Sequence, residues 1–194
     1  MVEPWEVRRS ERLYGNKIFQ VRADWCVPPD AAAGAAEVPF WIIDSSDWCN
    51  VVARTAGGDY IMVAQWRFGT RRVSLEIPGG IVDPGEAPAA AAARELVEET
   101  GYVPGGPLVS LGTVDPNPAI LANRTHLFAA EGCRPATAAE RRAQDHHERI
   151  QVRLVPAADL DRLIMAGEIS HAIMIAALLK YRIRASGSGP QAPG

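Results

Sequence analysis

The distribution of apolar and polar residues predicts a series of short strands in the first two thirds of the chain. Stretches rich in β-branched and aromatic residues, bounded by turn residues, are typical of strands. We predict six of them, at residues 18–27, 40–44, 48–54, 60–66, 108–114 and 125–130. The residues GGD at 57–59 predict a hairpin turn between the third and fourth strands.

A helix is predicted between Pro88 and Gly101. Proline suits the first turn of a helix, glycine suits the position just past its end, and the alanines and glutamates between them are good helix formers. Glycines and a proline at residues 79–85 predict a turn-rich loop before this helix.

The last third of the chain predicts one more strand, at 150–155, and two helices, at 157–167 and 169–183. The polar segment 134–149 is predicted to be a long loop. On the last helix we expect one apolar face to form core or dimer contacts, made by Ile173, Ile175, Ala176 and Leu179. Strands, helix, strands and helices in this order predict an α/β or α+β domain with a mixed sheet.

Composition narrows the function classes. The 194 residues are 47% hydrophobic and 22% charged, with a formal net charge of −3. This balance gives no basic face for nucleic acid, and no apolar run approaches the roughly 20 residues that span a bilayer. Cys26, Cys49 and Cys133 fit neither a disulfide framework nor a zinc site. Because the N-terminus also lacks the apolar core of a signal peptide, we expect a cytoplasmic protein.

Three glutamates crowd the predicted helix in the sequence RELVEETGY, at residues 94–102. At about 100° per residue, Glu95, Glu98 and Glu99 fall on one side of the helix. Carboxylates beside a glycine loop are hard oxygen donors that suit Mg²⁺ or Mn²⁺ bound to a polyphosphate. Arg94 lies next to them and can orient a carboxylate. The alternative is a solvated helix face.

The surrounding sequence matches the pattern G-x5-E-x7-R-E-U-x-E-E-x-G-U, in which U is bulky and apolar. The matching residues are Gly80, Glu86, Arg94, Glu95, Glu98, Glu99 and Gly101. This pattern resembles the signature of the Nudix hydrolases. The resemblance implies an α/β/α sandwich around a mixed sheet. It also implies a β-rich segment at 1–44 that serves as a dimerisation or swap element and a Nudix domain at 45–184. The composition of ASGSGPQAPG, at 185–194, predicts a disordered tail.

The resemblance also implies roles for single residues. Glu95, Glu98, Glu99 and the carbonyl of Gly79 would bind Mg²⁺, with Mn²⁺ as the alternative. Gly80, Glu86 and Gly101 would support the site, and Arg94 would orient its carboxylates. The general base would be Glu148, which lies beside His146 and His147, or else Glu98. The alternative for the segment around Glu148 is a plain solvated loop.

Substrate preference is indicated by Pro118, which lies 16 residues after Tyr102. ADP-ribose pyrophosphatases of this superfamily typically carry a proline there, although DPNPA is also an ordinary turn sequence. Arg67 and Arg124 are candidate contacts for the substrate phosphates, and the alternative role for Arg67 is an ion pair on the sheet.

We therefore expect a homodimeric, Mg²⁺-dependent enzyme that hydrolyses ADP-ribose or a related nucleoside diphosphate sugar. The products would be a nucleoside monophosphate and a sugar phosphate. The alternatives are a GDP-mannose-type sugar nucleotide hydrolase and a non-catalytic Nudix-like nucleotide sensor.

Overall fold

The fold is that of a computed structural model, which describes residues 1–142 and 149–187. The chain forms two compact units. The first unit comprises Met1–Ser46 and Asp115–Asn123. The second comprises Asp47–Val114 and the described residues from Arg124 onward. The domain boundaries predicted above stay predictions, and so does exchange of the N-terminal segment between subunits.

The first unit is built on a three-stranded antiparallel sheet in the order β1-β2-β3. Its strands are β1 (Glu6–Gly15), β2 (Phe19–Val27) and β3 (Val38–Ser45). The strands β2 and β3 were predicted, whereas β1 was not. Backbone hydrogen bonds between Ile43 and Ile120 (2.7 Å), and between Ala122 and Ile43 (3.1 Å), attach the segment 115–123 to β3.

The second unit contains a mixed sheet whose main order is β11-β5-β4-β10-β8, with β6 on β5, β7 on β4 and β9 on β10. The pair β4–β10 is parallel, and the other pairs are antiparallel. The strands are β4 (Trp48–Thr55), β5 (Tyr60–Arg67), β6 (Arg72–Glu76), β7 (Gly79–Ile81), β8 (Tyr102–Val103), β9 (Val109–Val114), β10 (Thr125–Pro135) and β11 (Ile150–Val155).

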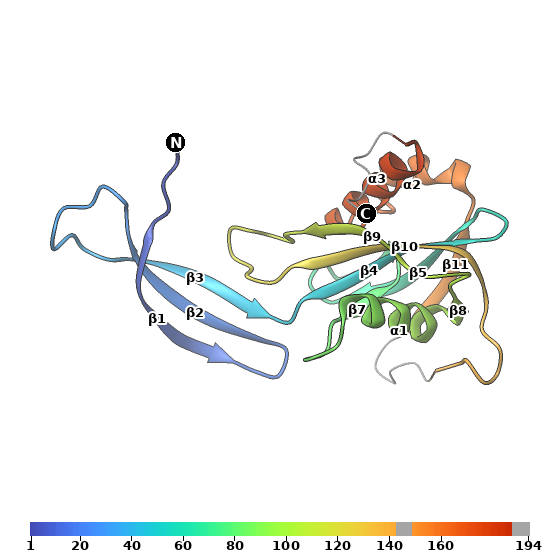
Figure 1. The fold of residues 1–194 in the computed structure, drawn as a ribbon, viewed down its shortest axis with the longest axis horizontal. Coiled ribbons are helices and arrows are strands. Elements are labelled where there is room, and N and C mark those ends of the chain that lie inside the picture. The colour runs from blue at the N-terminus through green and yellow to red at the C-terminus, as the bar shows by residue number, and fades with distance from the viewer. Residues whose placement is uncertain (143–148, 188–194) are drawn as a thin grey trace. The chain divides into compact units, whose positions relative to one another are not determined.

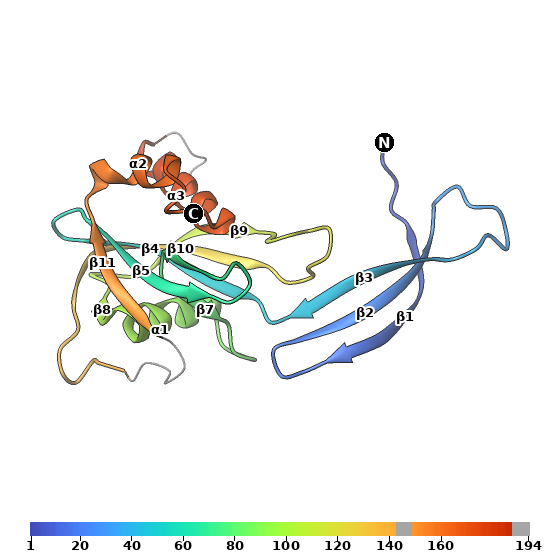
Figure 2. The ribbon, with the colours of Figure 1, turned by 180° about the vertical axis from the view of Figure 1, so that it is seen from behind.

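Helices cover both faces of this sheet (Figures 1 and 2). Helix α1 (Pro88–Thr100) lies on one face, and α2 (Leu160–Met165) and α3 (Ala172–Ala185) lie on the other. Successive side chains of β4 point to opposite faces of the sheet. Val51 packs in the hydrophobic cluster that includes residues of α1, and Val52 packs in the cluster that includes residues of α3. The predicted α/β/α sandwich around a mixed sheet is confirmed.

The helix ends follow from their sequence. Helix α1 begins at Pro88 and stops at Gly101, whose left-handed φ of 69° lets its N–H donate to the carbonyl of Val97. Of the four residues predicted to form core or dimer contacts on α3, Ile173 is buried and Leu179 is exposed, and the dimer contact stays a prediction. The buried face follows a spacing of three to four residues and consists of Ile173, Met174, Ala177, Leu178 and Tyr181.

The strands β4 and β5 separate soon after the hairpin that joins them. They pair only at Ala53–Ile61 and Arg54–Tyr60. Beyond that point β5 pairs with β6, and β4 pairs with β7. The segment Gly79–Ile81 was predicted as part of a turn-rich loop. It is instead a short strand that pairs with β4 where β5 no longer does. The divergence opens the sheet next to α1.

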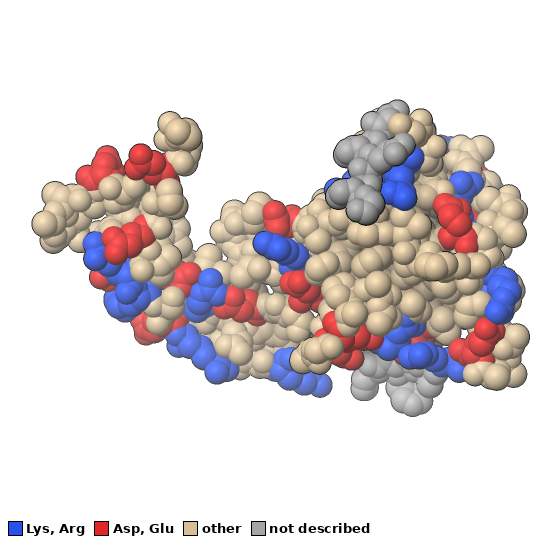
Figure 3. Space-filling model, in the orientation of Figure 1, with Lys and Arg blue, Asp and Glu red and all other residues tan. Residues whose placement is uncertain are grey.

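On the face drawn in Figure 3, acidic and basic side chains are interspersed. In the described part of the chain, no helix has both the length and the apolar character needed to cross a membrane.

Candidate active site

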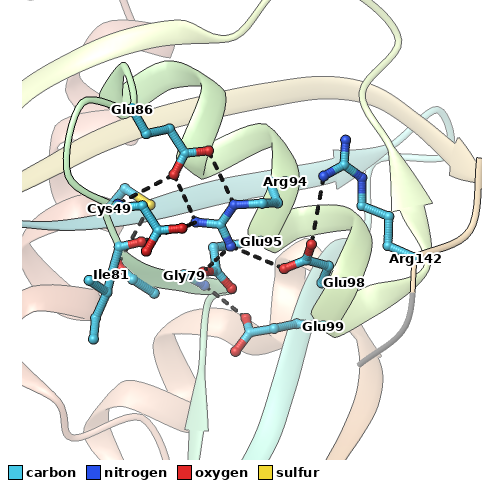
Figure 4. A network of polar contacts seen from close by, with 11 residues as sticks. Cys49, Gly79, Ile81, Glu86, Arg94, Glu95, Glu98, Glu99 and Arg142 are labelled. Atoms are coloured by element: carbon cyan, nitrogen blue, oxygen red, sulfur yellow. Dashed lines mark hydrogen bonds and ion pairs between the residues drawn. The ribbon is translucent and has the colours of Figure 1, made fainter. Parts of the chain in front are cut away.

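Arg94 joins the acidic side chains of α1 to the loop before it (Figure 4). Its Nε and Nη2 donate to the two carboxylate oxygens of Glu86, at 3.1 and 3.0 Å. Its Nη1 donates to Glu95 at 2.7 Å and to Glu98 at 3.1 Å. One cation therefore contacts three of the signature carboxylates and offsets their mutual repulsion. These hydrogen bonds, that with Glu86 foremost, raise the pKa of Arg94.

The same guanidinium fixes the loop to the helix. Arg94 Nη2 also donates to the backbone carbonyl of Ile81, at 3.1 Å. The hydrogen bond from Arg94 lowers the pKa of Glu86, so this carboxylate stays ionised at neutral pH. The structure thus brings Arg94 and Glu86 together, and the supporting role that the signature resemblance implies for them stays a prediction.

Glu99 lies deeper than the other two glutamates. Its side chain is buried, and its Oε2 accepts a hydrogen bond from the backbone N–H of Gly79 at 2.8 Å. Glycine is needed at two adjacent positions here. A Cβ at Gly79 would lie 2.2 Å from the backbone oxygen of Cys49, and one at Gly80 would lie 2.4 Å from Oε1 of Glu95. The two glycines let β7 approach both β4 and the carboxylates.

A cavity of about 650 Å³ opens where β4 and β5 diverge. Glu95 and Glu99 of α1 line it, together with Gly79 and Gly80. Other lining residues come from β5, β6 and the start of α3, including Arg67, Glu76 and His171. Cys49 also lines the cavity, but burial raises the pKa of its thiol to about 11. The thiol stays protonated at neutral pH and is not a nucleophile.

Arg67 forms an ion pair with the fully buried carboxylate of Glu76. Nε donates to Oε1 at 2.8 Å and Nη2 donates to Oε2 at 2.6 Å. Burial alone would raise the pKa of Glu76, but the hydrogen bonds and charge of Arg67 lower it below its ordinary value. Arg67 is thus both a member of the cavity wall and half of an ion pair, so both of its predicted roles fit its position.

Glu98 lies between two arginines. Besides Arg94 it contacts Arg142, whose Nη1 is 3.7 Å from Oε1 of Glu98 (Figure 4). Glu98 is more exposed than Glu99, since its side chain is on the outer part of the helix surface. Its position on α1 is compatible with either of its predicted roles, metal ligand or general base.

The donors beside the cavity fit a hard divalent cation by their chemistry. Three carboxylates within one and a half turns of α1 offer only oxygen, as Mg²⁺ and Mn²⁺ prefer. Within residues 1–142 and 149–187, no three acidic, histidine or cysteine side chains already converge as a metal site. Arg94 is bound to Glu95 and Glu98, and Glu99 accepts from Gly79, so a cation would have to take over some of these contacts.

Two other predicted residues, Pro118 and Arg124, are not among the described residues that line the cavity. Pro118 is exposed in a turn of the first unit, where Leu121 N–H donates to Asn117 at 2.8 Å. Arg124 has an exposed side chain, and its backbone N–H donates to Asp47 at 2.8 Å. Glu148 falls outside the described residues, as do His146 and His147. The roles predicted for these residues stay predictions.

Two cavity residues were not predicted as functional. Glu76 lies in LEIPGG, where a charged residue between apolar neighbours is a usable signal of a buried ion pair. The other is His171, which caps α3 and also lines the cavity. A further histidine, His126, is not among the described residues that line the cavity, and its Nε2 lies 2.8 Å from Oδ2 of Asp47.

The sequence of this chain is similar to those of known proteins. The model of the NUDIX domain matches residues 48–178. The chain is 30% identical over 160 residues to an ADP-ribose pyrophosphatase of Bacillus subtilis (strain 168), covering 82% of this chain and 83% of that protein. It is 30% identical over 192 residues to an ADP-ribose pyrophosphatase of Mycobacterium tuberculosis (strain ATCC 25618 / H37Rv), covering 97% of this chain and 88% of that protein.

A solved structure is similar over nearly the whole chain. The crystal structure of an ADP compounds hydrolase superposes with a TM-score of 0.82 and 19% sequence identity, covering 97% of this chain and 99% of that one. At this level of identity the likeness establishes the fold.

Proposed function

Because this chain belongs to the NUDIX domain family and is a Nudix hydrolase, we propose that it hydrolyses the diphosphate bond of ADP-ribose or a related nucleoside diphosphate sugar. Water attacks one phosphorus, and a nucleoside monophosphate and a sugar phosphate leave. One observation carries the proposal: the cavity has the carboxylates Glu95 and Glu99 on the helix side and the guanidinium of Arg67 on the strand side. A diphosphate that enters it meets both a cation-binding surface and a fixed donor.

The preference for ADP-ribose is supported by the two relatives named above, which are ADP-ribose pyrophosphatases similar to this chain over more than four fifths of its length. The position of Pro118 supports it independently. A GDP-mannose-type hydrolase is the alternative with the same chemistry, and a nucleotide sensor is the alternative without turnover.

Each residue has a defined task in this proposal. Glu95, Glu98, Glu99 and the carbonyl of Gly79 hold Mg²⁺ or Mn²⁺, which when bound neutralises diphosphate charge and lowers the pKa of water. Arg94, bound to Glu86, orients Glu95 and Glu98.

The remaining tasks concern the substrate and the proton. Arg67 binds a phosphoryl oxygen in a fixed orientation, because Glu76 holds two of its donors. Arg124 and Pro118 are the further proposed substrate-binding residues. The proton of the attacking water goes to Glu148 or Glu98. A comparison of E148Q with E98Q shows which glutamate is the general base, because the variant that lacks the base loses the acidic limb of the pH–rate profile.

A homodimer is the proposed assembly. Strand β1 is exposed along nearly its whole length. The first unit also exposes several large apolar side chains: Trp5, Val7, Leu13, Tyr14, Ile18, Phe40 and Trp41. Exposed apolar surface of this kind is typical of protein–protein interfaces. Light scattering after gel filtration tests the proposal, and a monomer at micromolar concentration would contradict it.

The proposed activity is tested by phosphate release in an assay coupled to alkaline phosphatase. ADP-ribose, ADP-glucose, GDP-mannose and UDP-glucose are compared, with Mg²⁺ and with excess EDTA, for the wild type and E99Q. We expect ADP-ribose to be turned over fastest, and both EDTA and E99Q to abolish turnover. Fastest turnover of GDP-mannose would select the alternative substrate. Binding without turnover of any of the four would favour the sensor.

A further inference from the structure

His171 is the N-cap of α3, and this role fixes the position of its proton. Its Nδ1 accepts a hydrogen bond from the backbone N–H of Ile173, at 3.2 Å. A ring nitrogen that accepts a hydrogen bond carries no proton. The neutral ring therefore carries its single proton on Nε2, which makes that atom a donor.

The same ring belongs to the wall of the cavity. His171 lines it beside Arg67 and Glu76. Burial lowers the pKa of His171, with Glu76 opposing and Arg67 reinforcing this effect, so the ring is neutral at pH 7. Within residues 1–142 and 149–187, the cap is the one hydrogen bond that the imidazole makes. The Nε2–H is thus the polar atom that this side chain has left to offer to a ligand.

We propose that His171 is a substrate-binding residue whose Nε2–H donates to an oxygen of the substrate diphosphate next to Arg67. This inference rests on the proposed function. Arg67 and His171 lie close enough for the charge of one to affect the other. A cationic and a neutral donor side by side suit an acceptor with negative charge, and the phosphoryl oxygens are the anionic acceptors of a nucleoside diphosphate sugar.

Two substitutions of His171 separate its role as the N-cap of α3 from its proposed role as a hydrogen-bond donor to substrate. Asparagine can place an oxygen near the position of Nδ1 and is among the best N-cap residues, but it lacks a group at the position of Nε2. Glutamine reaches the position of Nε2 with its amide N–H₂ but has no acceptor for the cap. H171N therefore keeps the cap and loses the donor, and H171Q does the reverse.

The experiment measures the binding of a non-hydrolysable probe, α,β-methylene-ADP-ribose, by calorimetry in Mg²⁺, together with the melting temperature of each variant. We expect H171N to melt like the wild type but bind the probe about tenfold more weakly, as for the loss of one hydrogen bond to a charged group. We expect H171Q to melt at a lower temperature and to bind nearly as well as the wild type. A purely structural His171 gives the opposite order of affinities, and that result overturns the inference.

A second measurement reads the tautomer in the wild type itself and uses a variant only for signal assignment. Long-range ¹⁵N–¹H spectra of the histidine rings report the tautomer, and H171N identifies the signals of His171. We expect the Nε2–H tautomer and a shift of its signals when the probe is added. The Nδ1–H tautomer, unchanged signals, or a wild type that does not bind the probe would each overturn the inference.

The binding assay is independent of turnover. A wild type that hydrolyses no sugar nucleotide, yet whose affinity for the probe depends on His171 as described, refutes the proposed hydrolysis and leaves the diphosphate contact standing. A wild type that hydrolyses ADP-ribose, with H171N binding the probe as tightly, refutes the contact alone.

Discussion

Glu76 on β6 and Arg67 on β5 form an ion pair in which one partner is inaccessible and the other is not. The carboxylate of Glu76 is fully buried, whereas the side chain of Arg67 is 43% exposed. Both carboxylate oxygens bind the guanidinium, at 2.8 and 2.6 Å. A buried charge without its partner is strongly unfavourable, so the pair confines Arg67 to the cavity wall.

This asymmetry predicts unequal effects of removing either partner. R67Q leaves a buried carboxylate unpaired and should lower the free energy of unfolding by about 3 kcal/mol. E76Q leaves an arginine that can turn to water and should cost only about 1 kcal/mol. The double variant R67Q/E76Q should be more stable than R67Q alone. Urea unfolding measures all three, and equal costs for the two single variants would contradict the asymmetry.

The same pair predicts a loss of stability in acid. The pKa of Glu76 lies below its ordinary value of 4.5 in the folded chain. The ionised carboxylate thus contributes stability that is complete above the pKa of the unfolded state and disappears as the pH falls through the lower pKa of the folded state. Unfolding measured between neutral pH and acid should show a steeper loss below pH 4.5 in the wild type than in E76Q. Parallel curves would mean that Glu76 is not the group responsible.

Alanine substitutions at the two adjacent glycines of β7 should have different effects, one on the stability of the fold and the other on turnover. A methyl group at Gly79 meets the backbone of Cys49, which cannot move aside, so G79A should destabilise the fold by about 2 kcal/mol. A methyl group at Gly80 meets the end of the Glu95 side chain, which can move. G80A should therefore keep most of its stability while turnover falls about 10- to 100-fold, because a metal-binding carboxylate is displaced.

The control for both glycine variants is G106A, since a Cβ at Gly106 meets no atom within 4 Å. Its melting temperature and turnover should equal those of the wild type. An unstable G80A with normal specific activity would show that Gly80 protects packing and not the carboxylate.

The sequence predicted the elements whose pattern is local. Helix α1 was predicted within one residue at each end, since Pro88 and Gly101 act within a single turn. Strands β4 and β5 were recognised because their residues are buried and apolar. Strand β1 was missed because its side chains are almost all exposed and two register shifts interrupt its alternation. Strand β7 exists only through its pairing with β4, which no local signal encodes.

In the candidate site too, contacts between residues close in the sequence were predicted, and contacts between distant residues were not. The signature grouped Glu86 and Arg94 with the glutamates of α1, and Arg94 does contact Glu86, Glu95 and Glu98, because eight residues and one helix link them. The roles of these residues stay predictions. The opposite wall of the cavity depends on tertiary structure. Arg67 meets Glu76 through the pairing of β5 with β6, and His171 reaches them from a helix a hundred residues further along the chain. Such contacts follow from topology, which a single sequence does not specify.

The final prediction concerns Glu86, which binds Arg94 through two hydrogen bonds. In E86Q the guanidinium loses its bidentate carboxylate partner in the loop, where Asp83 remains at 4.0 Å. Its remaining hydrogen-bonded carboxylates are Glu95 and Glu98, two of the proposed metal ligands. It should then compete more strongly with the cation. We expect the Mg²⁺ concentration for half-maximal turnover to rise about five- to tenfold, equivalent to about 1 kcal/mol, with a smaller change in turnover at saturating Mg²⁺.

A matched control is available in Glu140, a partly exposed carboxylate whose two oxygens accept hydrogen bonds from Nη1 and Nη2 of Arg134, at 2.9 and 2.8 Å. E140Q should leave the Mg²⁺ dependence unchanged, because Arg134 contacts none of the α1 glutamates. If E86Q lowers turnover equally at every Mg²⁺ concentration, Glu86 supports the helix without governing the competition between Arg94 and the metal. If both variants shift the Mg²⁺ dependence alike, the effect reflects net charge and not the Arg94 contacts.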